Sequence, residues 1–126
     1  MILPCEIAVK TVIPAIKATL AKELVKTYGL TQNEVAEILG ISQSAVSKYT
    51  RQVRGYTIRI QHMKDVQPLI SRMVTLLGDE NPKRSNFLKL FCQTCLMIRK
   101  KGIMCRFCQK MEPKIKEECE LCLKYS

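Results

Sequence analysis

Two short amphipathic segments separated by a glycine, within residues 31–51, constrain the fold of this chain more than any other feature. Thr31-Gln32-Asn33-Glu34 predicts a helix start, because a Thr hydroxyl accepts from the amide three residues later while the Glu carboxylate bonds back to the Thr amide. Gly40 tolerates the positive φ of a tight turn, and Ser42 is placed to cap the next helix. We therefore expect one helix ending at Leu39 and another running from Ser42 to near Arg54.

The apolar residues around this turn have the spacing that two tightly crossing helices require. Such a pair needs a small residue at the crossing and apolar side chains that lock the helices together. Ala36 is the small residue, and the apolar positions are Val35, Leu39, Ile41, Val46 and Tyr49. The alternative is a plain helical hairpin with a solvated basic helix, but agreement at every packing position favours the tight pair.

Further helical periodicity flanks this pair in the first half of the chain. A helix is expected from Val12 to Tyr28, with Pro14 in its first turn and Gly29 after its end. Its predicted buried stripe is Ile13, Ile16, Leu20 and Leu24. A turn of helix including Cys5 is expected before it. Tyr56 to Ile60 alternates between apolar and polar residues, which predicts a short strand or extended wing.

The second half of the chain contains two more amphipathic helices and a cysteine-rich end. Val66–Leu77 has helical spacing, with Pro68 in its first turn, and either forms a dimer contact or packs on the preceding helices. Asn86–Lys101 is helical on the spacing of Phe87, Phe91, Cys95 and Ile98, and a last helix is expected at about Pro113–Leu123. The predicted fold is all-α, divided into residues 1–62, a connecting segment 63–82 and a cysteine-rich segment 83–126.

Composition limits the partners and the compartment. The formal charge is +10, and such a field attracts nucleic acid unless it is merely a solvated surface. Charged residues interrupt the first twenty positions, so we expect neither a signal peptide nor a membrane span and place the protein in the cytoplasm. No catalytic triad, phosphate-binding glycine loop or paired carboxylates is present, so an enzyme is not expected.

Six of the seven cysteines form three CxxC pairs, and metal binding explains their spacing better than a disulfide framework in a reducing cytosol. The candidate ligands are Cys92, Cys95, Cys105, Cys108, Cys119 and Cys122. Six ligands exceed the four of one Zn²⁺ or one [4Fe–4S] cluster, so four ligands with two spare thiols, a two-zinc cluster and a disulfide among the remainder all stay open. Cys5 stands apart and is interpreted as a buried small hydrophobe, and His62 as a surface or core residue.

The neighbours of these cysteines favour iron–sulfur over zinc. Zinc knuckles commonly place glycine after the second cysteine, whereas Leu96, Gln109 and Leu123 follow here. Apolar neighbours such as Phe91 and Phe107 exclude water from a cluster, and the basic run between Arg99 and Lys110 offsets its charge.

The pattern Gln32-x-x-Val35-Ala36-x-x-Leu39-Gly40-Ile41-Ser42-Gln43-Ser44-x-Val46-Ser47-x-Tyr49 resembles the Cro and phage-repressor type of helix-turn-helix regulator. The resemblance implies that the helix after Ser42 enters the major groove of double-stranded DNA and that the protein works as a homodimer. The base-edge candidates, all expected to be exposed, are Gln43, Ser44, Ser47 and Lys48. Phosphate or backbone contacts are expected from Arg51, Arg54, Thr31, Gln32 and Ser42.

Leu3-Pro4-Cys5-Glu6 and Val12-Ile13-Pro14-Ala15-Ile16 are similar to an archaeal branch of that family. This resemblance implies a C-terminal cysteine-rich segment that holds an iron–sulfur cluster as a sensor. Two alternatives stay open: a purely structural zinc site beside the DNA-binding unit, and a thiol–disulfide oxidoreductase. The last is disfavoured because no βαβ pattern surrounds the CxxC pairs.

Overall fold

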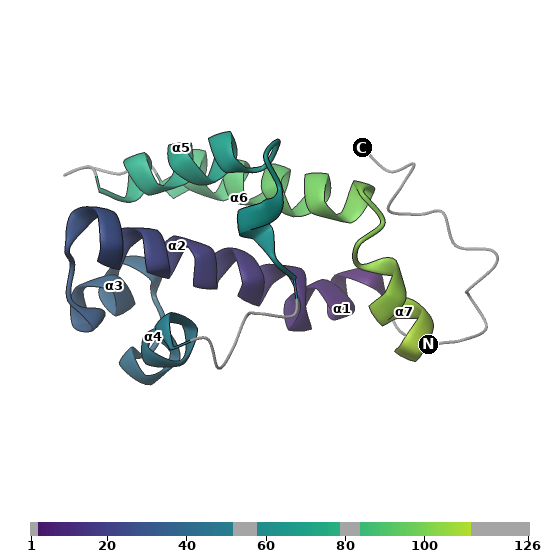
Figure 1. Cartoon of the computed structure of the whole chain (residues 1–126), viewed down its shortest axis with the longest axis horizontal. Coiled ribbons are helices and arrows are strands. Elements are labelled where there is room, and N and C mark those ends of the chain that lie inside the picture. The colour runs from purple at the N-terminus through teal and green to yellow at the C-terminus, as the bar shows by residue number, and fades with distance from the viewer. Residues whose placement is uncertain (1–2, 52–57, 79–83, 112–126) are drawn as a thin grey trace.

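The computed structural model describes residues 3–51, 58–78 and 84–111, and its regular elements are helices (Figure 1). Within these ranges there is no strand, so the all-α prediction is confirmed. The elements are α1 (Pro4–Lys10), α2 (Val12–Tyr28), α3 (Gln32–Leu39), α4 (Gln43–Thr50), the short 3₁₀-helix η1 (Ile60–His62), α5 (Gln67–Leu77), α6 (Arg84–Lys100) and α7 (Cys105–Met111).

Helix α2 is the central element of the fold. It contacts α1, α3, α4, η1, α5 and α6, and it lies between the α3–α4 pair and the α5–α6 pair in Figure 1. Ala15, Ala18 and Ala21 are all buried, and such small side chains let neighbouring helices approach α2 closely. Gly29 ends the helix as expected, with a left-handed φ of 63°.

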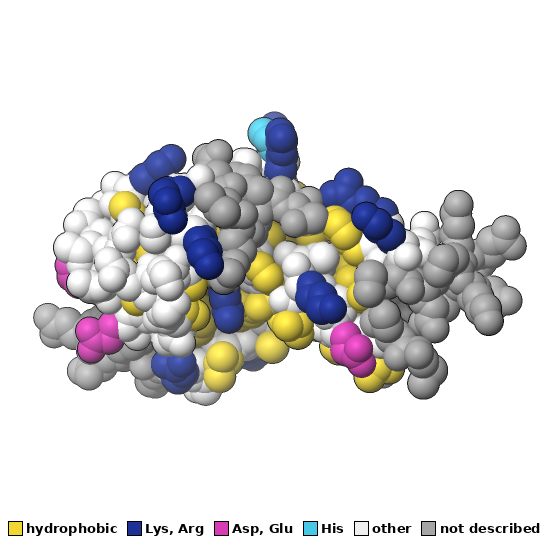
Figure 2. Space-filling view, turned by 90° about the horizontal axis from the view of Figure 1, so that it is seen from below, with side chains coloured by type: hydrophobic (Ala, Val, Ile, Leu, Met, Phe, Trp, Pro, Cys, Tyr) yellow, Lys and Arg dark blue, Asp and Glu magenta, His cyan; other side chains and the backbone are white. Residues whose placement is uncertain are grey.

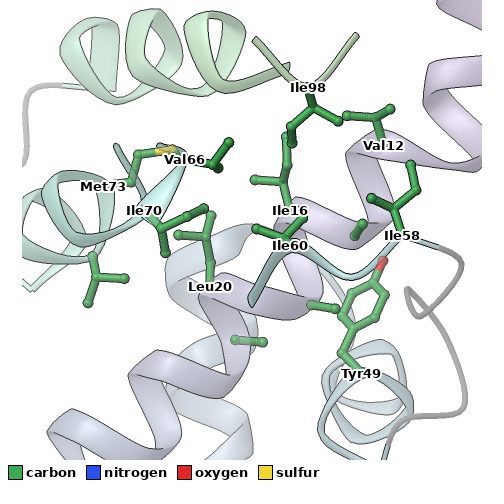
Figure 3. Close-up of a cluster of buried hydrophobic side chains, with 14 of the residues drawn as sticks. Val12, Ile16, Leu20, Tyr49, Ile58, Ile60, Val66, Ile70, Met73 and Ile98 are labelled. Atoms are coloured by element: carbon green, nitrogen blue, oxygen red, sulfur yellow. The ribbon is translucent and has the colours of Figure 1, made fainter. Parts of the chain in front are cut away.

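One hydrophobic core joins the two sides of α2 (Figure 3). Ile16 and Leu20 of α2, both 0% exposed, belong to the same buried cluster as Tyr49 of α4 and as Ile70 and Met73 of α5. The core also includes Leu90, Ile98 and Met104 from the cysteine-rich end of the sequence. The three predicted segments therefore share one core, although the division itself stays a prediction.

The apolar stripe of α5 is buried against other helices of the same chain. Ile70, Met73, Val74 and Leu77 are buried, and α5 packs against α2 and α6. Gln67 fixes the start of this helix, because its Nε2 donates to the Ile60 carbonyl of η1 at 2.9 Å. Of the two roles considered for this helix, packing on the preceding helices agrees with the structure, and these four residues offer no dimer surface.

The buried side of α6 agrees only in part with the predicted spacing, whose fully buried member is Ile98. Leu90, Thr94 and Ile98 are buried, whereas Phe87, Phe91 and Cys95 are half-buried at the edge of the core. Thr94 is buried at 0% exposure without an unsatisfied hydroxyl, because that hydroxyl donates to the Leu90 carbonyl at 2.7 Å. Helix α7 was not expected, and the predicted helix at 113–123 lies outside the described residues.

Two further predictions need correction around α4. The helix ends at Thr50, four residues before the predicted Arg54, and the Thr50 hydroxyl donates to the Ser47 carbonyl, a local bond that competes with helix continuation. The expected strand is also wrong at its described end, since Ile58 is in a bend and Ile60 begins η1. Both isoleucines are buried, but no neighbouring strand is present in the described ranges to pair with them.

Candidate functional site

The α3–α4 pair is built by local hydrogen bonds that its sequence specifies. Thr31 and Glu34 form the predicted capping box: the Glu34 amide donates to the Thr31 hydroxyl at 3.2 Å, and the Thr31 amide donates to the Glu34 carboxylate at 3.2 Å. Gly40 has a left-handed φ of 68°, and the Ile41 amide donates back to the Ala36 carbonyl at 3.0 Å. Ser42 then caps α4 by accepting from the Ala45 amide at 3.1 Å.

The two faces of α4 have different chemistry. Val46 and Tyr49 are buried against the rest of the molecule, at 0% and 6% exposure. The opposite face carries polar side chains at positions one helical turn apart: Gln43, Ser44, Ser47, Lys48 and Arg51. The fold therefore gathers all four predicted base-edge candidates on one side of one helix.

Exposure along this polar face is uneven. Gln43 and Ser44 are exposed, but Ser47 and Lys48 are half-buried, although all four were expected to be exposed. Part of the cover over Ser47 is the Arg51 side chain, whose Nε donates to the Ser47 carbonyl at 3.4 Å. Of the four base-edge candidates, the two exposed ones therefore lie in the first turn of α4.

The predicted backbone contacts lie around the same pair of helices. Thr31 and Ser42 are exposed at the N-termini of α3 and α4, and Gln32 is half-buried at the first position of α3. Arg51 is exposed at the C-terminal end of α4. Arg54 lies outside the described residues.

Basic side chains extend beyond α4. Figure 2 shows the face that carries α3, α4, α1 and α7, with Lys and Arg distributed across it and acidic side chains toward its margins. Arg84, which the sequence did not single out, lies beside the turn, with its Nη2 3.9 Å from the position that a Cβ on Gly40 would occupy. Arg84 begins α6, more than forty positions after Gly40, so no local sequence pattern could indicate that it lies beside this turn.

The four described cysteines of the CxxC pairs lie on α6 and α7, and no three of them are grouped as metal ligands. Cys92 is exposed, Cys95 and Cys105 are half-buried, and Cys108 is buried in the core. Among residues 3–51, 58–78 and 84–111, no three metal-ligating side chains are arranged to hold a metal ion. Thiolates suit zinc and iron–sulfur clusters, but the four described ones do not by themselves form such a site. Cys119 and Cys122 lie outside the described residues.

Cys5 is not the buried hydrophobe that was expected. It is exposed on α1, and the Arg99 Nη1 atom lies 3.9 Å from its sulfur. Burial raises the pKa of the Cys95 thiol, and the charge and hydrogen bond of the Arg99 guanidinium oppose this rise. Arg99 therefore lies beside the sulfur of a residue from the start of the chain, a contact that no local sequence pattern indicates.

Comparison with known families identifies the DNA-binding part. The helix-turn-helix family model matches residues 22–60, which include the last part of α2, all of α3 and α4, and the first residue of η1. This match supports a regulator of the Cro and phage-repressor type and agrees with the turn geometry. No curated protein and no solved structure matches the chain. None of the helices in the described ranges has the length and apolar character needed to cross a membrane.

Proposed function

We propose that the protein is a sequence-specific transcriptional regulator that inserts α4 into the major groove of double-stranded DNA. The observation that carries this proposal is the two-sided character of α4, with Val46 and Tyr49 locked into the core and Gln43, Ser44, Ser47 and Lys48 on the opposite side. Because its apolar side is packed in the core, α4 can present its polar side chains to base edges in a fixed register.

In this proposal, some residue types read the bases and others position the protein on the DNA backbone. Gln43, at the exposed N-terminal end of α4, has an amide that can pair bidentately with adenine, while Ser44 is able to bond several base edges. Arg51 and the capped N-termini of α3 and α4 suit phosphate oxygens, which set the register of the helix without reading sequence. The net charge of +10 adds a general attraction to DNA.

Selection from a randomised DNA pool, followed by affinity measurement at fixed salt, tests the proposal. Replacing Gln43 with Ala should weaken binding to the selected site by about fivefold or more and relax preference at one base pair, because a bidentate base contact contributes about 1–3 kcal/mol of discrimination. Gln61→Ala, an equal truncation of an exposed side chain on η1, is the matched control and should leave affinity unchanged. Failure to enrich any sequence, or equal losses in both variants, contradicts sequence-specific reading by α4.

We further propose that two copies bind twofold-related half-sites, since a single small module has modest affinity. The support is the resemblance to dimeric repressors. Because the apolar stripe of α5 is buried within the chain, the contact that we propose uses other surfaces. Light scattering of the full chain, alone and with a selected duplex, should give the mass of a dimer on one site. A 1:1 complex at saturation contradicts the dimer.

The third part of the proposal is that the C-terminal CxxC pairs bind an iron–sulfur cluster, with zinc as the alternative, and that the bound group controls DNA affinity. Its support is the spacing of the six cysteines and the basic and apolar residues around them. Iron and zinc quantitation with an absorbance spectrum, on protein purified without oxygen, separates the two groups. Operator affinity is then compared with and without the group at fixed salt, and equal affinities contradict the sensing role.

A further inference from the structure

The positive charge of the chain is concentrated outside the helix-turn-helix unit. Residues 84–111 contain seven Lys or Arg and no Asp or Glu, whereas residues 22–60 contain six basic and three acidic side chains. Five of the seven lie between Arg99 and Lys110, at the end of α6 and on α7. A field of one sign attracts polyanions to this end of the molecule.

Helix α7 has a buried side and a basic side. Met104, directly before the helix, and Cys108 are buried and lie one turn apart. Arg106 and Lys110, which are also one turn apart, are both exposed on the other side. The Arg106 guanidinium lies over the Phe107 ring, 4.7 Å from its centroid, which supports the side chain and leaves its charge in place. The fold therefore presents these two charges on one side of one helix.

Helices α4 and α7 lie on the same face of the molecule, below α2 and α1 in Figure 1, and Figure 2 views this face directly. Helix α4 packs on α2, and α7 packs on α1, which directly precedes α2 in the chain. Because α1 and α2 comprise 7 and 17 residues, together they span at most about 36 Å. The polar side of α4 and the basic side of α7 are thus about one helical turn of DNA apart or less, since that turn is about 34–36 Å.

We propose that the exposed side of α7 is a second DNA contact, at which Arg106 and Lys110 bind phosphates of the duplex whose major groove α4 enters. This inference rests on the proposed function, because α4 determines where the duplex lies. A guanidinium binds a phosphate bidentately and an ammonium binds it as a point charge, and neither contact reads sequence. The α7 contact therefore adds affinity and extends the footprint of the protein without changing its sequence preference.

The neighbouring charges favour these two residues over others nearby. The Lys101 ammonium is already paired with the Asp65 carboxylate. Helix α1, which contacts α7, carries one acidic and one basic side chain, so it adds no net charge beside the α7 pair.

The salt dependence of affinity for a selected duplex tests the contact. The double variant Arg106→Gln/Lys110→Gln should reduce the magnitude of the slope of log affinity against log salt by about 2. The advantage of the wild type over this variant should then fall about tenfold between about 50 and 200 mM salt. The full chain is used throughout, so the four glutamates of residues 112–126 are present in every variant.

The matched control is Arg72→Gln/Lys89→Gln, which also removes two charges. Both residues are exposed beside a cavity that is lined by α5 and α6 alone, and α5 lies across α2 from α4 in Figure 1. This control should leave the slope unchanged. Arg106→Lys keeps the charge without the guanidinium and should also retain the wild-type slope, and far-ultraviolet circular dichroism of each variant establishes that a lost contact does not reflect a lost fold.

Hydroxyl-radical footprinting locates the contact on the DNA. The wild type should protect a stretch of backbone beside the one opposite α4, and Arg106→Gln/Lys110→Gln should expose that stretch alone. Equal slopes for the two double variants, or a footprint that the α7 variant does not change, overturn the α7 contact and leave reading by α4 intact. A wild type that selects no DNA sequence overturns the proposed function, and the α7 contact falls with it.

Discussion

Gly40 shows how one residue controls the geometry of the DNA-binding unit. Its φ of 68° is a conformation that costs other L-residues about 1–2 kcal/mol, and it is the residue that turns the chain from α3 into α4. Gly78 also follows a helix, but its φ of −81° is accessible to any residue. The backbone conformation therefore favours glycine strongly at position 40 but not at position 78.

Alanine at these two positions should have opposite effects. Gly40→Ala is expected to lower the free energy of unfolding by about 1–2 kcal/mol, because the added Cβ is strained in the left-handed region. Gly78→Ala should leave it unchanged or raise it by up to about 1 kcal/mol, since the unfolded chain loses freedom while the nearest Tyr28 ring atom stays at 3.4 Å. Urea unfolding measures both, and equal losses contradict the assignment.

At the scale of one helix, the capping box determines where α3 begins. Thr31→Ala removes the acceptor of the Glu34 amide and should lower the free energy of unfolding by about 0.5–2 kcal/mol. Thr75→Ala is the matched control, because Thr75 is exposed within α5 and its hydroxyl bonds the Ser71 carbonyl, where alanine is a better helix former. If Thr75→Ala lowers the free energy of unfolding as much as Thr31→Ala does, the capping box adds no stability beyond that of an ordinary threonine in a helix.

An ion pair between two connecting segments gives the fold a defined acid response. The Lys101 ammonium donates to the Asp65 carboxylate and holds the pKa of Asp65 below its usual value. The unfolded chain binds that proton at the ordinary pKa of about 3.9, so the contribution is present above this pH and is lost as pH falls through the lower folded-state pKa.

Asp65→Asn should therefore destabilise the protein at pH 7 and have a smaller effect at pH 3. Urea unfolding of the wild type and the variant at both pH values measures the difference. Lys101→Gln removes the other partner of the ion pair, and the destabilisation that it causes should likewise be smaller at pH 3 than at pH 7. A destabilisation by Asp65→Asn that is equal at the two pH values contradicts the ionic origin.

The sequence predicted those parts of the molecule that a few adjacent residues decide. The capping box, the turn at Gly40 and the ends of α2 depend on hydrogen bonds within one or two turns, so their patterns are visible in the chain. The helix and the burial of Ile98 agree with the predicted spacing of α6, but its packing against α2 and α5 buries Leu90 and Thr94 more fully than Phe87 and Phe91. The same dependence on distant packing hid the approach of Cys5 to Arg99.

At the scale of the whole molecule, α2 holds the DNA-binding pair and the cysteine-bearing helices in one core. Leu20 is 0% exposed at the centre of that core, so Leu20→Ala should lower the free energy of unfolding by about 2–5 kcal/mol. Leu88→Ala on α6 removes the same atoms from a side chain that is 52% exposed, and it should change stability by less than about 0.5 kcal/mol. Two separate unfolding transitions in the wild type would contradict a shared core.

The charge of the whole molecule should appear in the salt dependence of DNA binding. A protein that neutralises Z phosphates releases their counterions, so log affinity falls linearly with log salt with a slope of about −0.9Z. Arg51→Gln should weaken binding to all sequences alike and reduce the slope by about 1, because Arg51 lies on the polar side of α4 and is assigned to phosphate.

Arg72→Gln is the control for this variant. It removes the same charge from α5, across α2 from the α3–α4 pair in Figure 1, and should leave the slope unchanged. Affinities of the wild type and both variants, measured from about 50 to 200 mM salt, give the three slopes. Equal slopes for the two variants would mean that long-range charge alone attracts the DNA and that Arg51 makes no phosphate contact, whereas a change confined to Arg51 places the DNA backbone along α4.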